Sequence, residues 1–219
     1  MRDWYGIFSA PESVMKSYLG PTAIVRPSDA QPFIRMIGSK CLLDVGVWGF
    51  SPPRGKSRPL INARFETVDV LPTFRDSFLR FRCLVPVTGY YEWQEEGCGY
   101  KRPWRFILKS SEDFGGYEDR KTELFVLAGL FSLDPRTNQR HFVIVTTEPN
   151  AKAAKVHDRM PVILDDVSMK VWLSPDSGLK SLKRVCRPYE GPDFYAEAVS
   201  KDLHKRPKTV AKNQLSLGL

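Results

Sequence analysis

The chain has 219 residues, 42% of them hydrophobic, and 33 Lys and Arg against 25 Asp and Glu give it a net charge of +8. This length and composition suit one globular domain, and the positive charge favours an anionic partner such as nucleic acid. The sequence has no apolar run long enough to cross a membrane and no secretory signal pattern at its start. We therefore expect a cytoplasmic protein without a membrane partner, most simply a monomer.

Cysteines and histidines are sparse and scattered. Cys41, Cys83, Cys98 and Cys186 form no C-x-x-C pair, and they are too few for a disulfide framework in a chain of this length. None of the three histidines has zinc-ligand spacing from a cysteine. We expect buried free thiols, no metal and no cofactor.

The pattern of secondary structure favours an α+β fold. Runs rich in β-branched and aromatic residues predict strands at 41–50, 82–87, 90–94, 104–109, 124–133, 141–147 and 194–199. Helical spacing or helix-start signals predict helices at 69–81, 149–157 and 165–173. Strands outnumber helices and do not alternate with them regularly, so the sheet should be mainly antiparallel.

Glu92 follows a turn at Thr88-Gly89 and lies in the run 90–94. Strand alternation places Tyr90, Glu92 and Gln94 on one face and the intervening aromatic residues on the other. A carboxylate among aromatic residues either faces solvent or lines a cleft. In a cleft, partial burial would raise the pKa of Glu92 and suit it to proton transfer.

Two further segments carry polar residues in patterns that leave alternatives open. In the run 59–68, predicted to be a half-buried strand, Asn62, Arg64 and Glu66 share one face, which is either a solvated surface or a polar wall in which Arg64 grips a phosphate. His157, in "KVHDRMPVIL", either caps the helix that ends near Val156 or transfers protons at a site.

Basic residues gather in two places. Arg54, Lys56 and Arg58 lie between Pro52 and Pro59, and five Lys and Arg lie within 201–212. We expect one domain over 1–204 and a basic tail over 205–219, which serves either as a solubilising end or as a DNA contact.

Five motifs in this order and at these separations closely resemble the SOS response-associated peptidase family. They are "WGF" (48–50), "INARFET" (61–67), "RCLVPVTGYYEW" (82–93), "AGLF" (128–131) and "VTTEPNAKAAKVHDRMPVIL" (145–164). The resemblance implies a single α+β domain with a barrel-like, mostly antiparallel β core and a basic groove for single-stranded DNA. It also implies sensing of abasic sites in the DNA damage (SOS) response.

The resemblance assigns roles to particular residues. Asn62, Glu92 and His157 fall on the family's catalytic positions, Arg64 on its phosphate-binding arginine and Trp48 on an aromatic residue suited to stacking against a base. Arg54, Lys56, Arg58 and Arg159 are expected to add DNA contacts.

The family's chemistry explains why such residue types would be needed. Members cap abasic sites covalently through an N-terminal cysteine, which is also linked to peptidase activity. An open abasic sugar is an aldehyde, and an α-amine with a pKa of about 7.7–8.0 is a better nucleophile near neutrality than a lysine at about 10.4. The cysteine thiol can then close a thiazolidine ring, while a glutamate of raised pKa or a histidine supplies the general acid.

The start of this chain departs from the family pattern. The family begins Met-Cys-Gly-Arg-Phe, whereas alignment of Gly6 and Phe8 places Tyr5 at the nucleophile position and Ile7 at the arginine. Ile24 replaces an asparagine that would help to line the DNA site. Three interpretations therefore compete: an active crosslinking enzyme with an unidentified nucleophile, a non-covalent reader of single-stranded or abasic DNA, and a family-fold protein with no DNA role.

Overall fold

The computed structural model describes residues 25–51, 58–109, 122–135 and 137–200. Several predictions fall outside these residues, so the structure does not bear on them. They are the predictions for Tyr5, Ile7, Ile24, Arg54, Lys56 and the basic tail at 205–219.

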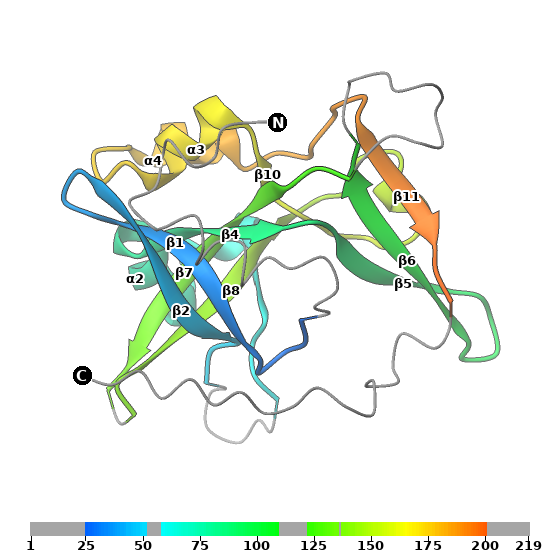
Figure 1. Cartoon of the computed structure of the whole chain (residues 1–219), viewed down its shortest axis with the longest axis horizontal. Helices are drawn as coiled ribbons and strands as arrows, with labels where there is room; N and C mark the ends of the chain where they lie inside the picture. Colours follow the sequence, from blue (N-terminus) through cyan, green and yellow to red (C-terminus); the bar gives the residue numbers. More distant parts are fainter. Residues whose placement is uncertain (1–24, 52–57, 110–121, 136, 201–219) are drawn as a thin grey trace.

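A closed ring of strands forms the centre of the molecule (Figure 1). Around the ring, β7 pairs with β4, β4 with β1, β1 with β2, β2 with β8, and β8 with β7. All of these pairs are antiparallel except β2–β8, which is parallel. The strands are β1 (Ala30–Ile37), β2 (Lys40–Trp48), β4 (Arg82–Val87), β7 (Phe125–Asp134) and β8 (Gln139–Thr147).

Three short strands extend this barrel. β3 (Asn62–Arg64) runs parallel to β8, β9 (Met160–Pro161) pairs antiparallel with β8, and β10 (Ile163–Leu164) pairs antiparallel with β7. The half-buried strand predicted at 59–68 is shorter than expected, because a 3-10 helix, η2 (Phe65–Thr67), follows directly after β3.

A separate antiparallel sheet of three strands lies beside the barrel, on the right in Figure 1. It contains β5 (Tyr90–Glu95), β6 (Lys101–Leu108) and β11 (Phe194–Ala198), with β6 in the middle. Thr88 and Gly89 carry the chain from β4 in the barrel to β5 in this sheet. A Cβ atom on Gly89 would lie 3.0 Å from the Phe106 carbonyl oxygen, so only glycine fits this crossing without a shift.

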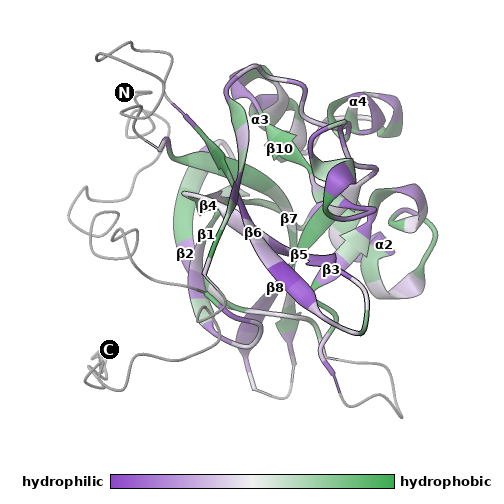
Figure 2. Ribbon diagram, turned by 90° about the vertical axis from the view of Figure 1, so that its right-hand side faces the viewer, coloured by the Kyte–Doolittle hydropathy of each residue, from purple (hydrophilic) through white to green (hydrophobic). Residues whose placement is uncertain are grey.

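Three helices group on one side of the barrel (Figure 2). α2 (Pro72–Arg80) begins with a proline in its first turn, where the missing N–H costs nothing. α3 (Asp166–Leu173) is capped by Asp165, whose side chain accepts a hydrogen bond of 2.7 Å from the Ser168 amide. α4 (Leu179–Val185) was not predicted from the sequence, and the helix predicted at 149–157 is a single 3-10 turn, η3 (Ala153–Lys155).

The core has two parts, because alternate residues of the barrel strands point to opposite faces. Ile34 and Leu84 pack on the face that meets the helices, together with Trp172 of α3. Phe33 and Val85 pack on the other face, together with Phe106 of the second sheet. The barrel and the second sheet therefore share a core, which fixes the position of β5 and of Glu92. The predicted α+β class with a barrel-like, mainly antiparallel β core is confirmed.

Among the described residues, no helix is long and apolar enough to cross a membrane.

Candidate active site

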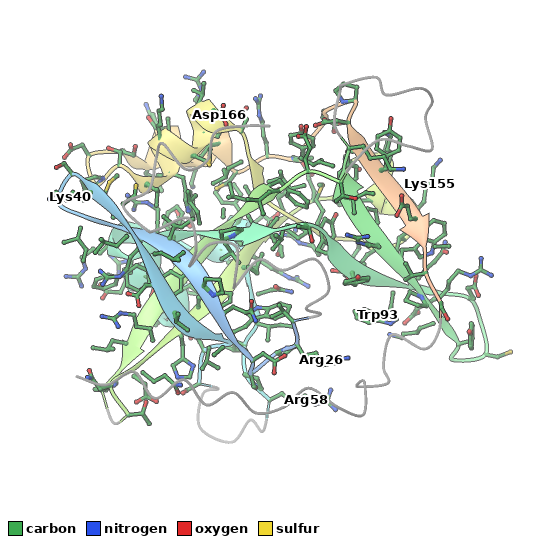
Figure 3. The ribbon with its side chains drawn as sticks, viewed as in Figure 1. Arg26, Lys40, Arg58, Trp93, Lys155 and Asp166 are labelled. Atoms are coloured by element: carbon green, nitrogen blue, oxygen red, sulfur yellow. The ribbon has the colours of Figure 1, made fainter. Side chains whose placement is uncertain are left out.

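A cleft of about 690 Å³ lies between the β5–β6 hairpin and the loop that follows η3. Its lining comes from two distant parts of the sequence: Glu92, Trp93, Gln94, Glu95 and Lys101 on the hairpin, and Lys155, Val156, His157 and Asp158 on the loop. In Figure 3, Trp93 and Lys155 mark the two segments, at the end of the molecule opposite Lys40. Two of the three residues predicted to be catalytic line this cleft.

Glu92 and His157 lie close together in the cleft. The His157 Nε2 atom is 3.9 Å from Glu92 Oε2, and the two side chains are 38% and 22% exposed. Burial raises the pKa of Glu92 above its ordinary value, and the nearby imidazole counteracts part of that rise. A carboxyl group in this setting can hold a proton nearer to neutrality, as a general acid requires.

Backbone contacts fix the His157 ring. The Arg159 amide donates a hydrogen bond of 3.0 Å to His157 Nδ1, so in the neutral imidazole the proton lies on Nε2, facing Glu92. Asp158 Oδ1 also lies 3.1 Å from Nδ1.

Arg159 ties the His157 loop to the segment after β3. Its guanidinium donates two parallel hydrogen bonds to the Glu66 carboxylate, at 2.7 and 2.8 Å, and a third of 2.7 Å to the Thr146 carbonyl oxygen. The hydrogen bond from Arg159 is the main reason why the pKa of Glu66 lies below its ordinary value. Because these contacts occupy both terminal nitrogens of the guanidinium, Arg159 acts here as a brace. Its predicted contact with DNA stays a prediction.

Asn62 and Arg64 lie on β3, next to the same part of β8. Both side chains are exposed, and Ala63 between them is buried, as strand alternation predicted. Arg64 is paired across the strands with Thr146, and Thr146 is paired on the other side with Pro161, close to the His157 loop. Asn62 is paired with Ile144 of β8 and does not line the cleft.

Trp48 ends β2, half-buried. Its indole N–H donates a hydrogen bond of 3.0 Å to the Ile61 carbonyl oxygen, which fixes the edge of the ring and leaves only its face for stacking. Arg58 is exposed and lies with Arg26 at the lower edge of the view in Figure 3.

Gln94 is a site residue whose role was not predicted. Its side chain donates a hydrogen bond of 2.7 Å to the Lys155 carbonyl oxygen and accepts one of 3.0 Å from the Trp104 indole N–H. Strand alternation had placed Gln94 on the same face as Glu92, which was the available signal. Nothing in the sequence showed that this face meets residues 155–158.

The four cysteines, all of which lie within the described residues, form no disulfide bond. Cys83 and Cys186 are buried, and burial raises the pKa of Cys186 to about 12. Cys98 is exposed in the loop between β5 and β6, the hairpin that carries Glu95 and Lys101 of the cleft. The described part of the chain contains no group of three potential metal ligands.

Comparison with known proteins agrees with this architecture. The family model described as SOS response associated peptidase (SRAP) matches residues 8–206. The abasic site processing protein YoqW of Bacillus subtilis is 36% identical over 188 residues, which cover 82% of this chain and 79% of the relative. The abasic site processing protein YedK of Escherichia coli is 26% identical over 143 residues, 65% of this chain and 60% of YedK.

A solved structure supports the same assignment. A protein from Bacteroides thetaiotaomicron superposes with a TM-score of 0.72 at 26% identity, covering 90% of this chain and 86% of the other. The family model spans nearly the whole chain, and the fold and the sequence identity to the relatives agree with it. The chain therefore belongs to the SOS response-associated peptidase family.

Proposed function

We propose that the protein binds single-stranded DNA that contains abasic sites, with the abasic sugar in the cleft between Glu92 and His157. The observation that carries this proposal is the partly buried Glu92 carboxyl, of raised pKa, 3.9 Å from an imidazole nitrogen. The names of YoqW and YedK as abasic site processing proteins support it.

The site suits an aldehyde or its hydrate. Protonated Glu92 donates a hydrogen bond to the sugar oxygen, and His157 Nε2, facing Glu92, exchanges protons with Glu92. Asn62 is assigned to orienting the reacting group, Arg64 to a phosphate and the face of Trp48 to a base. Arg58 is assigned to adding positive charge along the bound DNA strand. Arg54 and Lys56, which lie outside the described residues, are assigned the same role.

The covalent step needs a group that Tyr5 does not supply. An α-amine adds to the aldehyde and loses water to form an imine, and a neighbouring thiol adds to the imine carbon to close the ring. A tyrosine within the chain has no α-amine, and its hydroxyl has a pKa of about 10. The proposed binding is therefore non-covalent.

A crosslinking assay tests the proposal. The protein is mixed with single-stranded DNA carrying an abasic site, and complexes are compared on native and denaturing gels. We expect a native complex, no adduct after denaturation, weaker binding to duplex, and affinity that falls with salt at a log–log slope of about −0.7 per phosphate contact. A robust adduct would refute the non-covalent assignment. Equal affinity for single strands and duplex would refute the proposed preference for single-stranded DNA.

Two variants make this assay sharper. Tyr5→Cys combined with deletion of residues 2–4 creates a Met-Cys-Gly start, and an adduct from this variant would mean that only the nucleophile is missing. Cys98→Ser is the matched control, since Cys98 is exposed near the cleft. An adduct of the unaltered chain that disappears in Cys98→Ser would identify that thiol as the nucleophile.

The alternative, a non-catalytic module that binds single-stranded DNA without recognising the abasic site, predicts a different result. Such a module would bind intact and abasic single strands equally well, and Glu92→Gln would leave both affinities unchanged. The proposed site instead predicts a preference for the abasic strand that Glu92→Gln reduces. We further propose that the protein acts as a monomer in the cytoplasm, which light scattering and fractionation would test.

A further inference from the structure

A second groove, of about 420 Å³, adjoins the cleft and contains none of the residues assigned above to DNA or catalysis. It lies between β6, β11 and the η3 segment. Its lining is Gln94, Trp104, Lys152, Lys155, Val156, Phe194, Tyr195 and Ala196, of which Gln94, Lys155 and Val156 also line the cleft. The two hollows are therefore contiguous, and Gln94 with its hydrogen bond to Lys155 stands between them.

Trp104 is the main aromatic surface of this groove and lies directly beside the candidate site. It is paired across β5 and β6 with Glu92, so the two side chains project from the same face, with Cβ atoms about 4.5–5.5 Å apart. Gln94 holds the indole N–H at 3.0 Å, which fixes the edge of the ring. What the half-buried indole offers the groove is its π-face.

Small residues leave space next to that indole. On β11, Ala198 is the direct partner of Trp104, and Ala196 lines the groove. Phe194 and Val156 complete an apolar lining, and both are buried. A flat ring can enter here without displacing a polar group from its partner.

The charged residues of the groove are all basic. Lys152 and Lys155 line it, and no carboxylate does so. The Lys152 ammonium donates to the Phe194 carbonyl oxygen at 2.6 Å and lies 5.2 Å from the Tyr195 ring centroid, so it is held at the groove. A ligand with a flat apolar ring and an adjacent negative charge matches this combination, and a nucleotide is such a ligand.

We propose that this groove binds the base of the nucleotide adjacent to the abasic site, stacked on Trp104, with Lys155 near its phosphate. The inference rests on the proposed function and adds a subsite to it. An abasic nucleotide has no base to stack, so the protein must gain stacking free energy from its neighbours. Two residues of β-strand, about 7 Å, separate Glu92 from Gln94, which places the groove within reach of the next nucleotide.

The test is a double-mutant cycle between Trp104 and each base that flanks the lesion. The oligonucleotide carries a tetrahydrofuran abasic analogue, and a second tetrahydrofuran replaces one flanking base at a time. We expect removal of one of the two flanking bases to weaken binding to the wild-type protein by about 5- to 150-fold. Trp104→Ala should cause a similar loss and make removal of that base inconsequential.

Two further variants keep the test decisive if Trp104→Ala does not fold. Ala196→Leu adds bulk at the open groove without removing a contact, and it should weaken binding to the strand with its bases intact and not to the strand lacking the identified base. Lys155→Ala should reduce the salt slope by about 0.7. Lys40→Ala is the control and should leave the salt slope unchanged. Lys40 is exposed in the β1–β2 hairpin at the other end of the molecule (Figure 3).

The outcomes separate this inference from the function on which it rests. If the wild-type protein does not bind single-stranded abasic DNA at all, the proposed function fails. If it binds, but base removal costs as much affinity in Trp104→Ala as in the wild-type protein, the function stands and the base subsite is wrong. The subsite is also wrong if Trp104→Ala weakens binding but removal of either flanking base does not.

Discussion

Arg82 lies on β4 with its guanidinium among the carboxyl ends of two helices. It is only 6% exposed, and it donates four hydrogen bonds to backbone carbonyl oxygens. Phe78 and Leu79, in the last turn of α2, accept at 2.7 Å. Trp172 and Ser174, at the end of α3, accept at 2.6 and 2.7 Å. One side chain therefore fastens both helices to the barrel.

The structure gives the size of the effect of Arg82→Met, which keeps much of the volume and removes the donors. Each hydrogen bond contributes at least about 1 kcal/mol net, since the donor is charged, so loss of the four costs at least about 4 kcal/mol. Burial lowers the pKa of Arg82, because removing its positive charge from water is unfavourable. Arg82→Met removes this desolvation cost, which offsets part of the loss. A net loss of about 3 kcal/mol lowers the Tm of a domain of this size by about 6–12 °C.

Thermal and urea unfolding monitored by circular dichroism measure this loss. Arg82→Lys, which keeps the charge but has fewer donors on a single nitrogen, should lose an intermediate amount. Arg80→Met is the matched control: Arg80 is on the exposed face of α2 in an i,i+4 pair with Asp76, and its loss should cost less than about 0.5 kcal/mol. If Arg82→Met unfolds within about 2 °C of the wild-type protein, the four hydrogen bonds from Arg82 do not hold the helices.

Three other substitutions test the candidate site and the core beside it. The Tyr90 hydroxyl is buried without a hydrogen-bond partner, so Tyr90→Phe should raise the free energy of unfolding by about 1 kcal/mol, and a loss of similar size in urea unfolding would reveal a partner. Burial raises the pKa of Glu92 above 4.5, so the folded carboxyl binds its proton more tightly than the unfolded one and stability falls as pH rises from 4.5 to the raised value. Glu92→Gln should remove that fall and raise Tm near neutrality, whereas an unchanged profile of Tm against pH would contradict the shift. Arg159→Met leaves the Thr146 carbonyl without its donor and should cost about 1–3 kcal/mol in unfolding while it weakens binding of abasic DNA; unchanged binding would show that the brace does not position His157.

Local patterns predicted most of the strands, because alternation is a property of short segments. The strand at 82–87 is found with the same bounds, and the one at 90–94 is one residue longer. β1 was missed because Pro32 and Arg35 interrupt its apolar run, although Pro32 is buried in the strand. α4 was missed because its seven residues are too few for a clear helical period.

The candidate site was predictable only in part, because its contacts join segments that are distant in sequence. The motifs predicted roles for Glu92 and His157, and their side chains do meet. The link between Glu66 and Arg159 was not predictable, since it spans 93 residues and both side chains look like ordinary surface charges in the sequence. Glu66 lies in the 3-10 helix that ends the predicted strand at 59–68 early, so the strand pattern did not place it opposite Arg159.

The parallel pairing of β2 with β8 has a consequence for the order in which the chain can fold. Val47 pairs with His141, so the ring closes only after about a hundred intervening residues are available. Until then, β2 has an open hydrogen-bonding edge. During synthesis, β1 and β2 emerge first and must wait for β8, which later pairs with β2, β3, β7 and β9. Closure is thus a late, non-local event, and a chain that stops before residue 139 retains an open edge on β2 that invites pairing with other chains.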